Sequence, residues 1–262
     1  EMPTFSVIIP TCNKPGRPEG CLERAIDSIK CQTWIHWKIF VVHDGPNDLE
    51  DGVMRIDRSM DDKIIHIRLP ENRHAGGARN AAMDLVPLTN FVIFLDDDDY
   101  LCDKDVMFNM AGAMINFADA NRDWPDMIRG GYIKHFVESG REKVRLIEDG
   151  SIEDATKSPV VSPCAKIVRA DNLVRFPEGV KHQDVVQHIA QCDKCNTYLN
   201  LNFPIFTYSI YDRPDKAKDS EESKKVLATV PQLLRSGADR YRREVSKEAA
   251  LKWADKIERM YT

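Results

Sequence analysis

Short apolar runs alternate with helix-like stretches along the N-terminal part of this chain. The runs are rich in Val, Ile and Phe and are bounded by polar or turn-forming residues, as is typical of buried strands; they cover 5–9, 38–42, 64–67 and 91–95. Between them, apolar residues recur at helical spacing at Leu22, Ile26 and Ile29, and a helix is predicted over 75–85. Strands that alternate with helices predict an α/β fold with a mostly parallel central sheet flanked by helices.

The alternation becomes less regular in the second half of the chain. The pattern predicts a helix over 103–118, and from 127 to 147 it becomes strand-like with a hairpin turn at 138–141, which adds a small antiparallel element. Further elements are predicted in this order: a strand over 165–168, a helix over 182–192 and extended chain over 197–210.

A polar stretch and a helical tail follow. Residues 212–223 are almost all polar or charged and include one Pro, so we expect a mobile loop there, of the kind that closes over a substrate. The tail over 222–261 is helical by composition, with breaks predicted near Pro231 and around Ser236–Gly237.

Composition narrows the class of protein. The 262 residues, 42% of them apolar, can bury one large core, and the net charge of -5 gives no general case for binding nucleic acid. Seven cysteines, an odd number, favour free thiols in a reducing compartment, so we expect a cytoplasmic protein. The spacing of Cys192 and Cys195 is that of a redox or zinc pair, but no second pair exists, and structural thiols are expected. No apolar stretch is long enough for a membrane span, and peripheral contact with a membrane stays open.

Four aspartates, Asp96 to Asp99, directly follow the apolar strand 91–95. They are thus placed at the carboxyl end of a sheet, the edge at which open α/β sheets bind ligands. Carboxylates this close repel one another, and a cation such as Mg²⁺ or Mn²⁺ relieves that repulsion while also binding substrate phosphates. Asp96 and Asp98 can point the same way from extended backbone. The alternative is a solvated acidic turn.

Other polar residues converge on the same edge. Asp44 follows the strand 38–42, and a carboxylate there suits the imide N–H of a uracil, while Arg79 can hydrogen-bond a base carbonyl or a ribose. Gly76 and Gly77 allow close backbone approach near a helix start, where N–H groups favour anions, although helix packing explains such glycines equally well.

The chain resembles glycosyltransferase family 2 in successive motifs. These are Val7 to Asn13, Val41 to Gly45, Asn72 to Asn80, and Phe94 to Asp99. The resemblance is strong over about the first 110 residues and weaker up to about residue 215. It implies the Rossmann-like GT-A fold and transfer of a sugar from a nucleotide diphosphate donor with inversion at the anomeric carbon. The domains expected are a GT-A domain over 1–220, with a nucleotide-binding half (1–99) and an acceptor-binding half (100–220), and a C-terminal helical extension over 221–262.

The resemblance also implies roles for single residues on the donor side. Asp44 recognises the base and Arg79 lies beside it, while the chain at Pro10, Thr11 and Asn13 lines the nucleoside pocket. In the Asp-x-Asp pair, Asp98 is the direct metal ligand and Asp96 lies nearer the ribose, with Asp97 and Asp99 as supporting carboxylates. Arg213 stands where family members often hold the donor phosphates.

On the acceptor side, the segment from Phe176 to Asp184 resembles the one that ends in the family's catalytic Glu-Asp pair. Gln183 departs from the usual Glu, but the position of the base is the second, Asp184, which would take the proton of the attacking hydroxyl. Without the resemblance, the favoured interpretation of Asp184 is a carboxylate at a helix N-terminus, where the helix dipole stabilises it. His43 stands where the family commonly has a second Asp.

The function expected from the sequence is therefore that of a metal-dependent inverting glycosyltransferase. It would use Mn²⁺ or Mg²⁺ and a UDP-sugar, and its acceptor would be a carbohydrate or another hydroxyl compound in glycan or polysaccharide synthesis. Two alternatives stay open: a sugar nucleotidyltransferase and a non-catalytic sugar- or metal-binding module.

Overall fold

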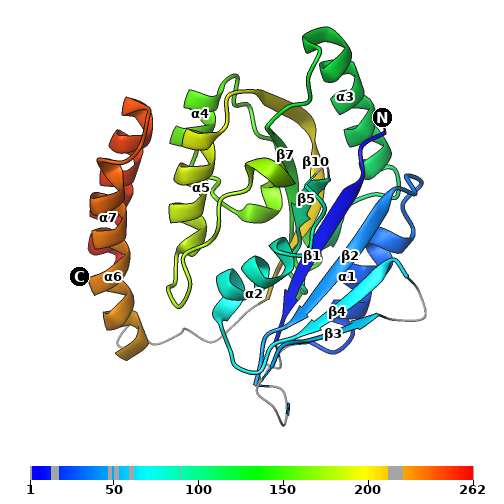
Figure 1. The fold of residues 1–262 in the computed structure, drawn as a ribbon, viewed down its shortest axis with the longest axis horizontal. Helices are drawn as coiled ribbons and strands as arrows, with labels where there is room; N and C mark the ends of the chain where they lie inside the picture. Colours follow the sequence, from blue (N-terminus) through cyan, green and yellow to red (C-terminus); the bar gives the residue numbers. More distant parts are fainter. Residues whose placement is uncertain are drawn as a thin grey trace.

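A computed structural model describes residues 2–12, 18–46, 49, 53–58, 62–88, 90–211 and 221–261. One ten-stranded sheet carries helices on both faces (Figure 1). The strands are β1 (Phe5–Thr11), β2 (Trp37–His43), β3 (Arg55–Arg58), β4 (Ile64–Arg68), β5 (Phe91–Phe94), β6 (Tyr100–Leu101), β7 (Met127–Phe136), β8 (Arg141–Arg145), β9 (Lys166–Arg169) and β10 (Tyr198–Ile210). The helices are α1 (Cys21–Lys30), α2 (His74–Met83), α3 (Val106–Asn121), α4 (Ile152–Lys157), α5 (Gln183–Lys194), α6 (Glu221–Ala238) and α7 (Glu244–Tyr261), with short 3₁₀ turns at Pro163–Ala165 and Ala170–Asn172.

The N-terminal half of the sheet is parallel. Strands β4, β2, β1 and β5 lie side by side in that order and run in one direction. The apolar residues of β1, β2 and β5 are explained by burial on both faces, because alternate side chains enter different cores. In β1, Val7 and Ile9 pack with Ala25 and Ile29 of α1, whereas Ile8 packs with the alanines of α2. The α/β prediction for this half is confirmed.

Strand β9 joins the two halves of the sheet. It is antiparallel to β5 on one side and to β7 on the other, and β10 is parallel to β7. Strands β7 and β10 therefore run in the same direction as β1 and β5, and their carboxyl ends lie at the same edge. The predicted hairpin is present as β7 and β8, whereas the short strands β3 and β6 and the helix α4 were not predicted.

Helices α6 and α7 pack against α5, on the side of the molecule away from β3 and β4 (Figure 1). Arg242 and Arg243 donate to the last backbone carbonyls of α5, and the Asp193 carboxylate accepts the backbone N–H groups of both arginines. The predicted break near Pro231 is wrong, because α6 continues through this proline. Its neighbours Val230 and Leu234 are fully buried, and this packing offsets the missing hydrogen bond. The predicted break at Ser236–Gly237 agrees with the end of α6 at Ala238.

Across the described residues, every helix is too short or too polar to cross a lipid bilayer.

Candidate active site

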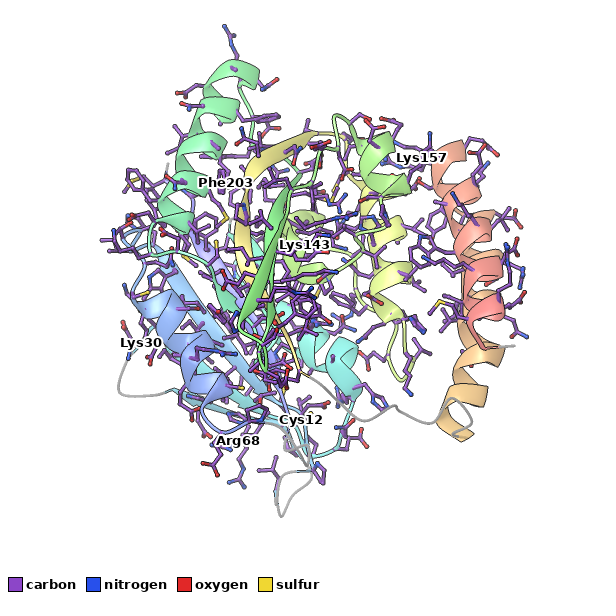
Figure 2. All side chains as sticks on the ribbon, turned by 180° about the vertical axis from the view of Figure 1, so that it is seen from behind. Cys12, Lys30, Arg68, Lys143, Lys157 and Phe203 are labelled. Atoms are coloured by element: carbon purple, nitrogen blue, oxygen red, sulfur yellow. The ribbon has the colours of Figure 1, made fainter. Side chains whose placement is uncertain are left out.

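The carboxyl edge of the parallel strands gathers most of the predicted site residues. Thr11 ends β1 and is paired in register with His43 of β2, which in turn is paired with Arg68 of β4. The backbone N–H of Asp44 donates to the carbonyl of Thr11 at 2.8 Å, so Asp44 is fixed directly beside Pro10 and Thr11. Figure 2 shows Cys12 and Arg68 at this edge. Two predicted donor-site residues, Asn13 and Arg213, and most of the predicted loop lie outside the described residues.

Asp44 is almost completely buried, with 6% of its surface exposed. One carboxylate oxygen accepts the backbone N–H of Arg73 at 2.7 Å. The adjacent His43 forms a 3.0 Å hydrogen bond with His66, and burial together with the charge of Arg68 lowers the pKa of His43 to about 4. His43 is therefore neutral near pH 7 and cannot replace a second carboxylate beside Asp44.

The four aspartates alternate in exposure. Asp97 and Asp99 are 2% and 1% exposed, whereas Asp96 and Asp98 are half-buried and reach the surface. Asp99 accepts the backbone N–H of Ser209 at 2.9 Å, which ties the aspartate loop to β10. Burial and the nearby charge of Asp96 raise the pKa of Asp99 to about 9. Repulsion between these neighbouring carboxylates contributes to the raised pKa, and a bound cation would relieve it.

Two arginines contact this loop. The Arg79 guanidinium donates to the Asp96 carboxylate at 2.6 Å, and Arg79 itself is buried. Arg24 of α1 donates through Nη2 to the backbone carbonyl of Asp98 at 2.7 Å, and to Ser209 Oγ and the Tyr211 hydroxyl at 3.2 Å each. Arg24 could not be predicted from local sequence, because the residues that it contacts lie far along the chain.

The donor set at this edge fits a divalent cation. Possible ligand atoms of Asp96, Asp99 and Cys164 lie within 4.8 Å of one another. Carboxylate oxygens are the ligands preferred by Mg²⁺ and Mn²⁺. Cys164 contributes less, because its burial raises the pKa of the thiol well above its usual range and keeps it protonated. The structure therefore groups Asp99 with Asp96, whereas the sequence-based pair was Asp96 and Asp98.

Helix α2 connects the aspartate loop with the segment that leads to Asp184. The side-chain amide of Asn80 forms two hydrogen bonds with the backbone of Phe176: it donates to the carbonyl and accepts the N–H, both at 2.9 Å. The same amide also donates to the Glu178 carboxylate. A Cβ atom on Gly76 would lie 1.7 Å from Oε1 of Gln183 and 3.0 Å from the carbonyl oxygen of Pro177, so a larger residue here would displace the flexible Gln183 side chain. Gly76 thus allows close packing of α2 against the start of α5, and its approach to a nucleotide stays a prediction.

Asp184 lies in the first turn of α5, directly after Gln183. Through Gln183, this end of α5 contacts the same helix whose Arg79 pairs with Asp96. Histidines with left-handed backbone stand at the starts of both helices, His74 with φ 58° and His182 with φ 52°. Such backbone is uncommon outside glycine and occurs often at functional sites.

This architecture defines a class of protein. Open α/β sheets bind ligands at the carboxyl ends of their strands, and here that edge carries a buried carboxylate, an acidic loop and two arginines. An α/β protein that holds a nucleotide or phosphorylated ligand together with a cation has these features.

Comparison with known proteins specifies the family. The sequence profile described as Glycosyl transferase family 2 matches residues 6–173, and the chain belongs to this family. The succinoglycan biosynthesis protein ExoW of Rhizobium meliloti is 33% identical over 149 residues, 56% of this chain and 45% of that protein. A GalNAc(5)-diNAcBac-PP-undecaprenol beta-1,3-glucosyltransferase of Campylobacter jejuni is 33% identical over 144 residues, 54% of this chain and 45% of that protein. The chain thus spans less than half the length of these relatives.

Solved structures confirm the GT-A fold. Residues 1–349 of S. aureus TarS, in complex with UDP-GlcNAc, superpose with a TM-score of 0.65 at 19% identity, covering 98% of this chain and 71% of that one. The mannosyltransferase PcManGT from Pyrobaculum calidifontis, in complex with GDP-Man and Mn²⁺, gives a TM-score of 0.59 at 15% identity and covers 100% of this chain and 74% of that one. The expected fold class is confirmed by these matches.

Proposed function

We propose that this chain is a metal-dependent, inverting glycosyltransferase domain that moves a sugar from a UDP-sugar to a hydroxyl acceptor in glycan synthesis. Three features are the main support: the buried carboxylate of Asp44, the acidic loop Asp96 to Asp99, and helix α5 with Asp184. All three lie beside α2 and the strand ends next to it. Solved relatives of the same fold hold UDP-GlcNAc, or GDP-Man with Mn²⁺. A domain boundary near residue 220 and a cytoplasmic site of action, supported by seven free cysteines, belong to the same proposal.

The side chains divide the chemistry between them. Asp44 would accept the imide N–H of uracil, while Arg79 positions Asp96 at the ribose side. Asp96 and Asp98, with Asp99 as support, would hold Mn²⁺ or Mg²⁺. The bound cation would neutralise the negative charge that develops on the leaving diphosphate. Asp184, at the start of α5, would take the proton of the acceptor hydroxyl as its oxygen attacks.

The two alternatives gain no support from the structure or the comparisons. A sugar nucleotidyltransferase normally has a Gly-rich basic loop after the first strand, and the segment from Thr11 to Gly20 carries only two basic residues, Lys14 and Arg17. A non-catalytic module would not transfer or hydrolyse a donor sugar, so either activity would exclude it. Release of pyrophosphate from a nucleoside triphosphate and a sugar phosphate would favour the nucleotidyltransferase.

The role of Asp184 is tested by the substitution Asp184→Asn. The amide keeps the size of the side chain but cannot take a proton, so we expect transfer to fall by on the order of 10² to 10⁴ with unchanged donor affinity. The control is Asp119→Asn, which changes an exposed aspartate of α3 in the same way. An equal loss of donor affinity in Asp184→Asn would contradict the role as a base.

The donor class is tested by thermal unfolding with UDP, GDP and their sugars, each with and without Mn²⁺. A ligand that binds the folded state raises the apparent stability, and a concentration of 100 times Kd adds about 2.7 kcal/mol. We expect uridine nucleotides to raise the melting temperature most, and to do so only with Mn²⁺. Stabilisation by guanosine nucleotides alone would overturn the UDP assignment.

A further inference from the structure

One face of the sheet formed by β8, β7 and β10 carries a row of cations. Residues that pair across neighbouring strands point to the same face. Lys134 of β7 is paired with Lys143 of β8, Phe136 with Arg141, and Tyr132 with Arg145. The four basic residues Lys134, Arg141, Lys143 and Arg145, here called the basic strip, thus share one face. Along a strand, alternate residues are ~7 Å apart, so the strip presents positive charge at regular intervals.

Among the described residues, the basic strip has no carboxylate partners. Within the described part of the chain, none of the four residues forms an ion pair with a carboxylate. The hairpin acid Glu142 is paired in register with His135, contacts it at 3.1 Å and therefore lies on the opposite face. All residues of β8 are exposed. The strip is thus a local group of exposed positive charge in a chain whose net charge is -5.

Aromatic rings lie between these cations. Lys134 is also paired with Tyr208 of β10, which is 44% exposed. Tyr208 packs edge-on against Tyr132 with ring centroids 6.4 Å apart, and the Arg141 guanidinium lies 4.2 Å above the ring of Phe136. Aromatic faces in contact with solvent can stack on the C–H faces of sugar rings, and guanidinium and ammonium groups bind carboxylates and phosphates.

The strip leads to the candidate active site. Phe136 and Ile210 end β7 and β10 at the edge that also carries the aspartates, because both strands run in the same direction as β1 and β5. Just beyond Tyr208, the N–H of Ser209 donates to Asp99, and the Tyr211 hydroxyl is joined through Arg24 to Asp98. Figure 2 shows Lys143 on the hairpin that faces the viewer, above the edge where Cys12 lies.

We propose that the basic strip and its aromatic rings bind an anionic glycan, a saccharide chain bearing carboxylates or phosphates, as the acceptor. The inference rests on the proposed glycosyltransferase function and adds the acceptor's charge to it. The positive charges favour an anionic partner. The aromatic rings beside them favour a partner that also has sugar rings, because a site for a simple anion would not need them. A chain laid along β7 and β8 would have its end at the aspartate loop.

The proposal is tested by measuring binding of defined hexamers by titration calorimetry. The probes are oligogalacturonate, which carries carboxylates, a glycerol phosphate oligomer, which carries phosphates, and neutral maltohexaose. We expect one or both anionic probes to bind more tightly than maltohexaose, and the affinity to fall as salt is raised. The two anionic probes distinguish carboxylate from phosphate as the group recognised. Equal binding of maltohexaose, or tighter binding of an oligothymidylate hexamer than of any glycan probe, would overturn the proposal.

A double variant locates the binding to this face. Lys143→Gln/Arg145→Gln removes two exposed charges, and we expect a loss of about threefold to tenfold in affinity for the anionic probes. The matched control is Lys30→Gln/Lys157→Gln, which removes two exposed charges from α1 and α4 (Figure 2). Equal losses in both variants would show that only net charge matters and would refute the strip.

Donor hydrolysis separates this proposal from the function it rests on. Breakdown of UDP-sugar without acceptor depends on the donor site alone, so it should be the same in the wild type and in both double variants. If hydrolysis and donor binding are intact but the anionic glycans do not bind, the strip proposal alone fails. If the wild type neither binds nor breaks down any nucleotide sugar, the proposed function fails.

Discussion

At the scale of single residues, Arg24 joins three parts of the site through one guanidinium nitrogen. Nη2 contacts the carbonyl of Asp98, the hydroxyl of Ser209 and the hydroxyl of Tyr211. The same guanidinium lies 4.6 Å above the ring of Tyr100, the residue that follows the aspartates. Arg24 thus fixes the backbone of the loop from α1 and brings a positive charge near it.

We predict that Arg24→Lys weakens Mn²⁺ binding in the presence of UDP. Lysine keeps the charge but cannot reproduce the planar fork, and a lost hydrogen bond costs about 1 kcal/mol, so the dissociation constant should rise about fivefold to twentyfold. Titration calorimetry measures the change. The control is Arg122→Lys, an exposed arginine after α3. An unchanged affinity would show that Arg24 is only a structural contact.

The aspartate loop and Arg24 show what sequence can predict at this scale. Alternation along extended chain predicted that Asp96 and Asp98 would face the same way, but β5 ends at Phe94 and the aspartates form a turn in which the backbone N–H of Asp99 donates to the carbonyl of Asp96. Asp96 and Asp98 are half-buried, and their common direction stays a prediction. Arg24 was not predicted, because its partner Asp98 is 74 residues away and no local pattern marks the contact. Which of the aspartates bind a metal stays a prediction.

At the scale of elements, α2 links the donor side to the acceptor side. Gly76, Arg79 and Asn80 are spaced so that they share one helix face. That face contacts Gln183 at Gly76, Asp96 at Arg79 and Phe176 at Asn80. A shift of α2 would therefore change the position of Asp184 relative to the aspartate loop.

We predict that Gly76→Ala lowers the transfer rate by about threefold to tenfold, because the new methyl group displaces the Gln183 side chain and changes the contact between α2 and the start of α5. Removing the obstacle should restore function, so Gly76→Ala/Gln183→Ala should be about as active as Gln183→Ala alone. Steady-state kinetics with saturating donor measures both. A double variant as inactive as Gly76→Ala would point to a close approach of ligand at Gly76 instead.

The control for this pair is Gly112→Ala in α3. A Cβ atom there meets no other group within 4 Å, and alanine is the better helix former. Activity should be unchanged and the melting temperature equal or slightly higher. A loss of activity in Gly112→Ala as well would show that the transfer rate responds to general changes in the helices.

The elements differ in how well sequence predicts them. Strands β1, β2 and β5 were found because burial on both faces leaves each of them rich in Val, Ile and Phe. Strand β3 has no such run, since it lies at the edge of the sheet and pairs only with β4. Strand β6 has only two residues, too few to show an alternation of apolar and polar positions. It is a strand because it pairs with β10. Tertiary contacts, which local sequence does not encode, decide these elements.

At the scale of the whole molecule, a buried polar cluster joins the sheet to α5. Lys166 of β9 is 1% exposed and donates from Nζ to Gln187 Oε1 at 3.0 Å and to His188 Nδ1 at 3.2 Å. Nε2 of His188 lies 2.8 Å from the carbonyl of Ala155 in α4 and donates to it. Lysine is rarely fully buried and histidine is often exposed, so neither Lys166 nor His188 could be assigned to the core from sequence alone.

Burial of Lys166 has a consequence for stability against pH. Burial is the main cause that lowers its pKa to about 7, and the nearby charges of Arg129 and Arg79 act in the same direction, against opposing contributions from Cys192 and Asp184. In the unfolded chain, lysine keeps a pKa near 10.4. Between these values the unfolded chain binds more protons than the folded protein, so the contribution of Lys166 to the free energy of unfolding rises with pH.

We predict that Lys166→Met removes this pH dependence. Met has a similar length without a charge, so the difference in free energy of unfolding between wild type and variant should rise in favour of the wild type from pH 7 to pH 9, at up to about 1.4 kcal/mol per pH unit. Urea unfolding at pH 7, 8 and 9 measures it, and taking the difference cancels the buried cysteines and tyrosines that titrate in the same range. Lys157→Met, at an exposed position in α4, should show no such slope. A difference independent of pH would mean that Lys166 stays charged in the folded protein throughout this range.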